Sequence, residues 1–207
     1  SIRFCVGGGA LLDLSQQQFF AAIGVPVYQG YGLTEATPII SANNPDVHKY
    51  GTSGMVIPNI VCKIVDAEGR ELAQGVKGQI VIKGNNVMKG YYLNPEATEK
   101  SIQDGWLFTG DLGYFDEDGF LVVVGREKAL LISPNGEKYS PEGIEEAIVN
   151  TAEYIQQVMV YNDMKPFTTA VIVLAEDKIR KHVAQQQIAG QTNLLKLIES
   201  DLQKFTT

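Results

Sequence analysis

The sequence predicts a mixed fold of the α/β plus α+β class, built from three successive parts. In residues 1–50, short apolar runs alternate with one amphipathic segment, which is typical of an α/β layer. In residues 51–124, β-rich runs are separated by turn signals, which predicts a small barrel or sandwich. In residues 125–207, two strand-like runs lie between helical stretches, which predicts a small α+β domain. A length of 207 residues and a hydrophobic content of 44% are sufficient to bury a core.

Residues 1–50 are expected to form the end of an α/β subdomain. The pattern predicts a strand at 2–6, a glycine-rich turn at 7–9, a helix at 15–23 and a strand at 25–29. The chain has no initiator Met and no leader sequence before its first strand-like run. We therefore expect this α/β layer to be incomplete and the chain to be a piece of a longer protein.

The middle part is expected to be mostly β. Strands are predicted at 60–65, 78–82 and 120–124, with turns at Glu68-Gly69 and Asp118-Gly119. One helix interrupts them, because Asn94 suits the N-cap, Pro95 suits the first helical position and the helical pattern ends near Ile102.

The last part is expected to be a small α+β domain that is incomplete. A strand at 129–132 and a turn at 134–136 precede a helix that begins at Pro141. Ser140 suits the N-cap of this helix, and Glu142 suits its positive end. Strands at 158–161 and 169–174 and two further helical stretches complete the prediction.

Composition excludes two classes of protein. A formal net charge of −7 and the lack of a basic stripe argue against a nucleic-acid partner. The longest apolar runs, such as 170–175, are far shorter than the roughly 18 residues of a transmembrane helix. Cys5 and Cys62 lie far apart in strand-like runs, which favours buried reduced thiols over a disulfide or a metal site. We expect a soluble cytoplasmic protein that can still contact a membrane peripherally.

The first candidate site motif is the run Gly30-Tyr31-Gly32-Leu33-Thr34-Glu35, which follows a predicted strand. Loops in this position commonly bind ligands. Tyr31 can stack on a purine, Thr34 can bond a phosphate oxygen and Glu35 can hold Mg²⁺. The two glycines would let the backbone approach the ligand. An ordinary turn is the alternative for a run of this composition.

The second motif is the run Trp106-Leu107-Phe108-Thr109-Gly110-Asp111. The carboxylate of Asp111 can accept both hydrogen bonds of a ribose diol, as carboxylates do in dinucleotide sites. The alternative is an Asp that caps a turn.

The third motif extends from Gly125-Arg126-Glu127-Lys128 to Asn135-Gly136-Glu137-Lys138. The planar guanidinium of Arg126 can bond a ribose or a phosphate. The alternative is an exposed, charged linker.

In this order and at these spacings, the three motifs resemble the adenylate-forming (AMP-binding) superfamily of acyl-CoA synthetases, luciferases and adenylation domains. The run VMKGYYLNPEAT within residues 84–98 is similar to long-chain fatty acyl-CoA synthetases in particular. The resemblance implies a distorted β-barrel for the middle part. It also implies a mobile C-terminal domain, joined to the rest by a hinge.

The resemblance also implies an activity. A fatty acid would attack the α-phosphate of MgATP to give acyl-AMP and pyrophosphate, and the thiol of CoA would then displace AMP. ATP, Mg²⁺ and CoA are thus the expected cofactors or co-substrates. Thr34 and Glu35 are the candidate catalytic residues, and Glu35 is the candidate Mg²⁺ ligand. The implied nucleotide-binding residues are Gly8, Gly9, Ala10, Gly30, Tyr31, Gly32, Thr34, Asp111 and Arg126. Lys128 matches the hinge, and Gly136 matches a loop that approaches CoA.

Two parts of the family pattern have no match in this sequence. One is the phosphate loop ending in Pro-Lys-Gly, and the other is the late catalytic lysine, for which Lys196 and Lys204 are poor substitutes. We therefore expect this chain to be inactive by itself. Four alternatives remain open: a ligase for another carboxylic acid, transfer to a carrier-protein thiol, a non-catalytic nucleotide-binding module, and a purely structural β-rich interaction domain.

Overall fold

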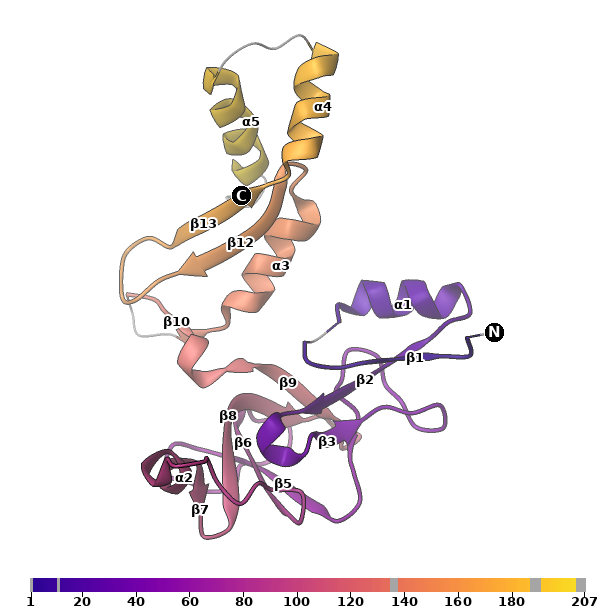
Figure 1. Ribbon diagram of the computed structural model, residues 1–207, viewed down its shortest axis with the longest axis vertical. Helices are drawn as coiled ribbons and strands as arrows, with labels where there is room; N and C mark the ends of the chain where they lie inside the picture. The colour runs from indigo at the N-terminus through magenta and orange to yellow at the C-terminus, as the bar shows by residue number, and fades with distance from the viewer. Residues whose placement is uncertain (1, 11, 135–137, 187–190, 204–207) are drawn as a thin grey trace. The chain divides into compact units, whose positions relative to one another are not determined.

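The computed structural model describes residues 2–10, 12–134, 138–186 and 191–203 (Figure 1). The chain forms two compact units, residues 1–128 and 129–207. Each unit has its own buried cluster of hydrophobic residues. The division of the first unit into two subdomains at residue 50 stays a prediction.

The first unit begins with a four-stranded sheet in the order β1-β2-β3-β4. Strands β1 (Cys5–Gly7) and β2 (Val27–Gly32) are parallel and are joined by helix α1 (Leu14–Ala22). Strands β3 (Ile39–Ala42) and β4 (Met55–Val56) continue the sheet in antiparallel pairing. The βαβ unit confirms the predicted α/β layer. Strand β2 extends to Gly32, however, so the first half of the glycine motif lies within the strand and not after it.

The second sheet of this unit is antiparallel and contains β5 (Ile60–Val65), β6 (Gly78–Gly84), β7 (Ile102–Gln103), β8 (Trp106–Phe115) and β9 (Leu121–Arg126). Strand β8 pairs with β6, with β7 at its start and with β9 at its end. Register shifts interrupt the β6–β8 and β8–β9 ladders. Such irregularities bend strands, and this sheet curls into a half-barrel.

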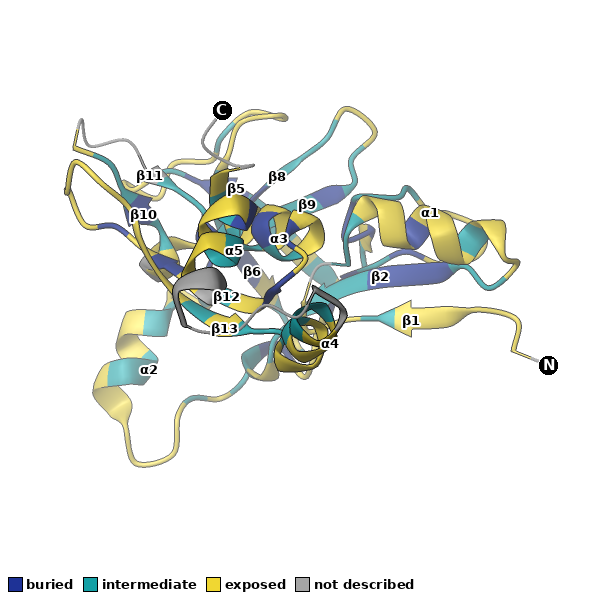
Figure 2. Ribbon diagram, turned by 90° about the horizontal axis from the view of Figure 1, so that it is seen from above, coloured by how far each residue is buried: buried dark blue, intermediate teal, exposed yellow. Residues whose placement is uncertain are grey.

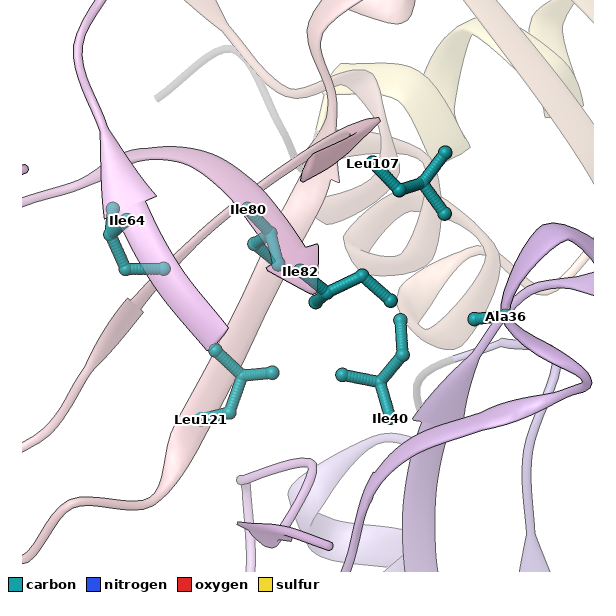
Figure 3. Packing of buried hydrophobic residues seen from close by; sticks show 7 residues of the cluster. All are labelled: Ala36, Ile40, Ile64, Ile80, Ile82, Leu107 and Leu121. Carbon is teal, nitrogen blue, oxygen red and sulfur yellow. The ribbon is translucent and has the colours of Figure 1, made fainter. Parts of the chain in front are cut away.

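The core of the first unit joins its two sheets (Figure 3). The half-barrel contributes Ile64, Ile80, Ile82, Leu107 and Leu121, and the first sheet with its following turn contributes Ala36 and Ile40. This packing holds the turn next to β3 against the half-barrel.

Helix α2 (Pro95–Ser101) confirms its predicted start, because Oδ1 of Asn94 accepts a hydrogen bond from Ala97 N at 3.1 Å. The predicted turns are also present, since Gly69 and Gly119 adopt φ angles of 78° and 83°.

The second unit contains β10 (Leu131–Ile132), β11 (Lys138–Tyr139), α3 (Pro141–Thr151), β12 (Ile155–Tyr161), β13 (Thr169–Leu174), α4 (Glu176–Gln186) and α5 (Gln191–Gln203). Leu131, Ile148, Ala152, Ile155 and Val160 form its core, whereas most of the outer faces of α3 and α4 are exposed (Figure 2). This arrangement confirms the predicted α+β pattern.

Three local expectations need correction. Ala129 belongs to a 3₁₀ turn (Glu127–Ala129), so the strand predicted at 129–132 begins at Leu131. Ser140 occupies the N-cap position of α3 but makes no capping bond, because its hydroxyl donates to the Glu142 carboxylate. Both cysteines were expected to be buried, but Cys62 is half-buried against the core of the first unit and Cys5 is exposed. None of the helices in the described residues is long and apolar enough to cross a membrane.

Candidate functional site

Three predicted site residues form one hydrogen-bonded chain in the first unit. Tyr31 lies near the end of β2, Asp111 lies within β8, and Arg126 is the cross-strand neighbour of Asp111 at the end of β9. The Tyr31 hydroxyl donates to Asp111 Oδ2 at 2.7 Å, and Arg126 Nε donates to Asp111 Oδ1 at 3.0 Å. Asp111 is therefore a buried strand residue and does not cap a turn.

The hydrogen-bonded chain of Tyr31, Asp111 and Arg126 has a buried part and an accessible part. The side chain of Asp111 is 7% exposed, whereas that of Arg126 is 69% exposed. Burial and the bond to Asp111 raise the pKa of Tyr31 well above its ordinary value, so the phenol stays a neutral donor. Arg126 compensates the Asp111 carboxylate while much of its guanidinium remains reachable by a ligand.

The glycines of the first motif are required by packing within the protein. A Cβ on Gly32 would lie 1.8 Å from the carbonyl oxygen of Pro38, whereas one on Gly30 would lie 3.2 Å from the carbonyl oxygen of Ser41. The structure thus gives a reason for Gly32 that differs from the predicted approach of a ligand. Only glycine fits there, because β2 and the start of β3 come too close together.

Glu35 lies in a 3₁₀ turn (Thr34–Ala36) directly after β2. Its side chain is half-buried, and its Oε1 accepts a 2.8 Å hydrogen bond from the hydroxyl of Tyr91. Thr34 is exposed on the same turn. Among the described residues, no three His, Cys, Asp or Glu side chains form a metal-binding cluster. A single carboxylate fits a Mg²⁺ ion that arrives with the phosphates of ATP, since Mg²⁺ is commonly bound by one or two carboxylates plus substrate oxygens.

A pocket of about 370 Å³ brings Glu35 and Arg126 together. Its wall consists of Leu33, Glu35, Gln79, Tyr91, Lys100, Ser101, Leu107, Phe108, Thr109, Gly110, Arg126 and Glu127. Among the described residues, Tyr31, Thr34 and Asp111 are not part of this wall. Asp111 is connected to the pocket wall by its hydrogen bond to Arg126. The pocket therefore combines two acidic residues, Glu35 and Glu127, with two basic ones, Lys100 and Arg126, a composition suited to a metal-bound anion.

The turn that contains Gly8, Gly9 and Ala10 lies beside β2 and not in this pocket. All three residues are exposed, and Gly9 adopts a φ of 83°. The buried Gln29 fixes the turn, because its Nε2 donates to Ala10 O at 2.7 Å and its Oε1 accepts from Leu12 N at 3.2 Å. The sequence pattern did not single out Gln29, although it directly precedes the glycine motif.

Sequence reasoning also missed Tyr91, Lys100, Gln79 and Glu127 as pocket residues. The run VMKGYYLNPEAT contains Tyr91 and supported the family resemblance, but no local pattern assigns a role to either of its tyrosines. Gln79 Nε2 donates to Glu127 Oε2 at 3.0 Å across the pocket wall. A contact between residues 48 positions apart cannot be found from periodicity.

Of the two remaining predicted residues, the structure describes one. Lys128 lies in the 3₁₀ turn Glu127–Ala129, at the boundary between residues 1–128 and 129–207. This position is compatible with a hinge, whose role stays a prediction. Gly136 lies outside the described residues.

A second hollow of about 420 Å³ lies in the second unit between α3 and β12. Its wall includes Glu145, Glu146, Asn150 and Gln156 but none of the predicted site residues. Its two glutamates would repel a phosphate or a carboxylate, because no Lys or Arg stands in its described wall, whereas Lys100 and Arg126 offset the two glutamates of the first pocket. The pocket of the first unit is the better candidate for a nucleotide.

Family models and relatives agree with this fold. The model described as "AMP-binding enzyme" matches residues 1–92, and the model described as "AMP-binding enzyme C-terminal domain" matches residues 128–205. A long-chain-fatty-acid–CoA ligase of Bacillus subtilis (strain 168) is 40% identical over 163 residues, which are 77% of this chain and 29% of that protein. A ligase of the same name from Mycobacterium bovis is 34% identical, over 83% of this chain and 27% of that protein. The chain thus spans about three tenths of the length of these relatives.

Solved structures show the same architecture. The o-succinylbenzoate–CoA synthetase of Bacillus subtilis in complex with AMP has a TM-score of 0.74 and 32% identity, covering 90% of this chain and 40% of that one. A crystal form of the same enzyme contains ATP and a magnesium ion, with a TM-score of 0.74 and 33% identity over 84% of this chain and 37% of that one. An anthranilate–CoA ligase with anthranoyl-AMP has a TM-score of 0.73 and 25% identity, covering 94% and 36%. The two family models together match most of the chain, and it therefore belongs to the AMP-binding, adenylate-forming enzyme family.

Proposed function

We propose that the protein to which this chain belongs is an acid–thiol ligase that activates a long-chain fatty acid as acyl-AMP and transfers the acyl group to CoA. MgATP places its phosphates and metal ion in the pocket of the first unit and extends beyond the pocket wall towards Tyr31. Glu35 holds the magnesium ion, Thr34 contacts a phosphate, and Asp111 with Arg126 holds the ribose. Tyr31 stacks on the adenine, next to the turn of Gly8, Gly9 and Ala10.

The observation that carries this proposal is the convergence of Glu35 and Arg126 on one pocket, with the buried Asp111 carboxylate directly behind Arg126. Adenylation needs charge neutralisation at the phosphates and alignment of the attacking carboxylate. The pocket offers one group for a metal ion and one for an anion or a ribose. These two groups are the minimum needed to orient a nucleotide.

The choice of a fatty acid as substrate rests on the names of the relatives. Both sequence relatives described above are long-chain-fatty-acid–CoA ligases, whereas the similar solved structures act on o-succinylbenzoate and anthranilate. A different carboxylic acid, or a carrier-protein thiol in place of CoA, is therefore the main competing proposal. We propose a cytoplasmic location, with peripheral membrane contact as one way to reach a fatty acid.

The experiment is an assay of pyrophosphate release by the gene product at its natural length. A panel of fatty acids of different chain length, o-succinylbenzoate and anthranilate is supplied with MgATP, each with and without CoA. We expect fatty acids to support release, and CoA to convert the adenylate to a thioester. If only an aromatic acid supported pyrophosphate release, that acid would replace the fatty acid as the proposed substrate. If no acid supported release, the ligase function would be refuted.

Substitutions test whether the activity depends on this pocket. Glu35→Gln and Asp111→Asn keep the size of the side chain and remove its charge, so we expect both to lower kcat/KM for MgATP strongly. Glu68→Gln is a matched control, because the Glu68 side chain is 65% exposed in an ion pair with Arg70. Equal activity of all three variants would show that the pocket is not the nucleotide site.

A non-catalytic nucleotide-binding module is the alternative from another class. The 207-residue chain contains no match to the family's phosphate loop, so we expect little or no ATP binding by this chain alone. Calorimetry with MgATP distinguishes the two proposals. Submicromolar binding by the isolated chain would favour the module.

A further inference from the structure

The segment of residues 86–91, which follows β6, is bonded to the turn that carries Glu35. Met88 N donates to Glu35 O at 2.8 Å, Asn86 Nδ2 donates to Ala36 O at 2.9 Å, and Thr37 Oγ1 donates to Asn86 O at 2.5 Å. These bonds hold the turn at Glu35 and at the two residues that follow it. The segment therefore lies close enough to contact the Glu35 carboxylate as well.

Tyr91 makes that contact. Its hydroxyl donates to Glu35 Oε1 at 2.8 Å, and both side chains line the pocket. One carboxylate oxygen is thus held by a donor, while the other can face a ligand.

Helix α2 holds Tyr91 in turn. Tyr91 N donates to Thr98 Oγ1 at 2.9 Å, and Thr98 Oγ1 donates to Asn94 O at 3.0 Å. Gly90 adopts a φ of 148°, and a Cβ there would come within 2.7 Å of the Thr98 side chain. The geometry therefore fixes the backbone at Tyr91 against a capped helix, as a positioning group requires.

We propose that Tyr91 is a positioning residue for the metal-binding carboxylate of Glu35, an inference that rests on the proposed function. Partners that hydrogen-bond a ligating carboxylate orient it, and their loss typically lowers metal affinity or activity roughly 10- to 100-fold. Tyr91 does not itself bind the ion. Its hydroxyl selects the rotamer in which Glu35 presents its other oxygen to magnesium.

The test compares Tyr91→Phe with Tyr92→Phe. The first change removes only the bonded hydroxyl, and the second removes the hydroxyl of a neighbour that is 91% exposed. Pyrophosphate release is measured against free Mg²⁺ at saturating ATP and acid. We expect Tyr91→Phe to raise the Mg²⁺ concentration for half-maximal rate about 10-fold, at an unchanged denaturant midpoint, and Tyr92→Phe to leave it unchanged.

A third variant separates positioning from a general loss of structure. In a Glu35→Ala background, which leaves Tyr91 no side chain to orient at this position, Tyr91→Phe should have no further effect on the Mg²⁺ dependence. An unchanged Mg²⁺ requirement in Tyr91→Phe, or an equal shift in Tyr92→Phe, would overturn the inference. Failure of the proposed function is distinguishable from this result, since the unmodified protein would then release no pyrophosphate with any acid.

Discussion

The hydroxyl of Tyr31 donates a 2.7 Å hydrogen bond to Oδ2 of Asp111, which lies 80 positions later in the chain. This bond joins the end of β2 to the middle of β8 and thus connects the two sheets of the first unit. Asp111 also accepts a hydrogen bond from Arg126 on β9, so one buried carboxylate connects β2, β8 and β9 at the candidate nucleotide site.

The Tyr31–Asp111 bond should contribute measurably to stability. We expect Tyr31→Phe to lower the free energy of unfolding by about 1.5 to 3 kcal/mol, the usual range for hydrogen bonds to charged groups. Trp106 is the single tryptophan of the chain and lies on β8, so its fluorescence under denaturant reports on this unit. Tyr92→Phe is the exposed control. In a double-mutant cycle with Asp111→Asn, strictly additive losses would mean that the two side chains are not coupled.

The same bond predicts how stability depends on alkaline pH. The pKa of Tyr31 in the folded protein is raised above its ordinary value of 10.0. The unfolded chain therefore loses the phenol proton first, so this contribution is fully present below pH 10 and is lost as the pH rises further. The loss approaches about 1.4 kcal/mol per pH unit. Denaturant unfolding at a series of alkaline pH values should show a shallower decline for Tyr31→Phe than for the unmodified chain. Parallel declines would contradict the assignment.

Gly32 and Gly30 should differ sharply in their tolerance of alanine. The added methyl group at Gly32 would overlap the Pro38 carbonyl, while at Gly30 it would only be tight against Ser41. We expect Gly32→Ala to destabilise the first unit by more than about 3 kcal/mol, since the backbone of β2 and β3 must separate. Gly30→Ala should destabilise the first unit clearly less. Denaturant midpoints measure both, and similar values for the two variants would show that the close approach is not maintained in solution.

Cys62 should be unreactive in the folded protein. Burial raises the pKa of its thiol to about 12, so almost no thiolate is present at neutral pH. We expect iodoacetamide at pH 8 to label Cys62 only after denaturation, as judged by mass spectrometry of the peptide that contains it. Unfolded protein provides the control for intrinsic reactivity. Rapid labelling under native conditions would indicate that β5 opens and that the thiol is not buried in solution.

The hinge proposal is tested at Lys128, which lies at the boundary of the two units. Lys128→Pro removes backbone freedom, so in the protein at its natural length it should spare pyrophosphate release and slow thioester formation. Lys128→Ala keeps the backbone freedom and should leave both steps nearly intact. If proline lowered both rates equally, the hinge assignment would fail.

Local chemistry made a large part of the fold predictable. The strand at Ile60–Val65, the strand at Thr169–Leu174 and the Asn94-capped helix were predicted with correct or nearly correct bounds. Apolar alternation and capping act between neighbouring residues, so they can be recognised in a sequence. The order of the three motifs also sufficed to identify the family.

The tertiary structure alone decided which of the predicted residues meet and what holds them. The bonds from Tyr31 to Asp111 and from Tyr91 to Glu35 join residues 80 and 56 positions apart, and packing of the first sheet and its turn against the half-barrel brings them together. The need for glycine at residue 32 likewise comes from the distance between two strands. The sequence by itself determined the family and the local elements, because periodicity and capping are short-range. The partners of Glu35 and Asp111 depend on packing between the two sheets and, for Arg126, on strand register, and no local pattern encodes either.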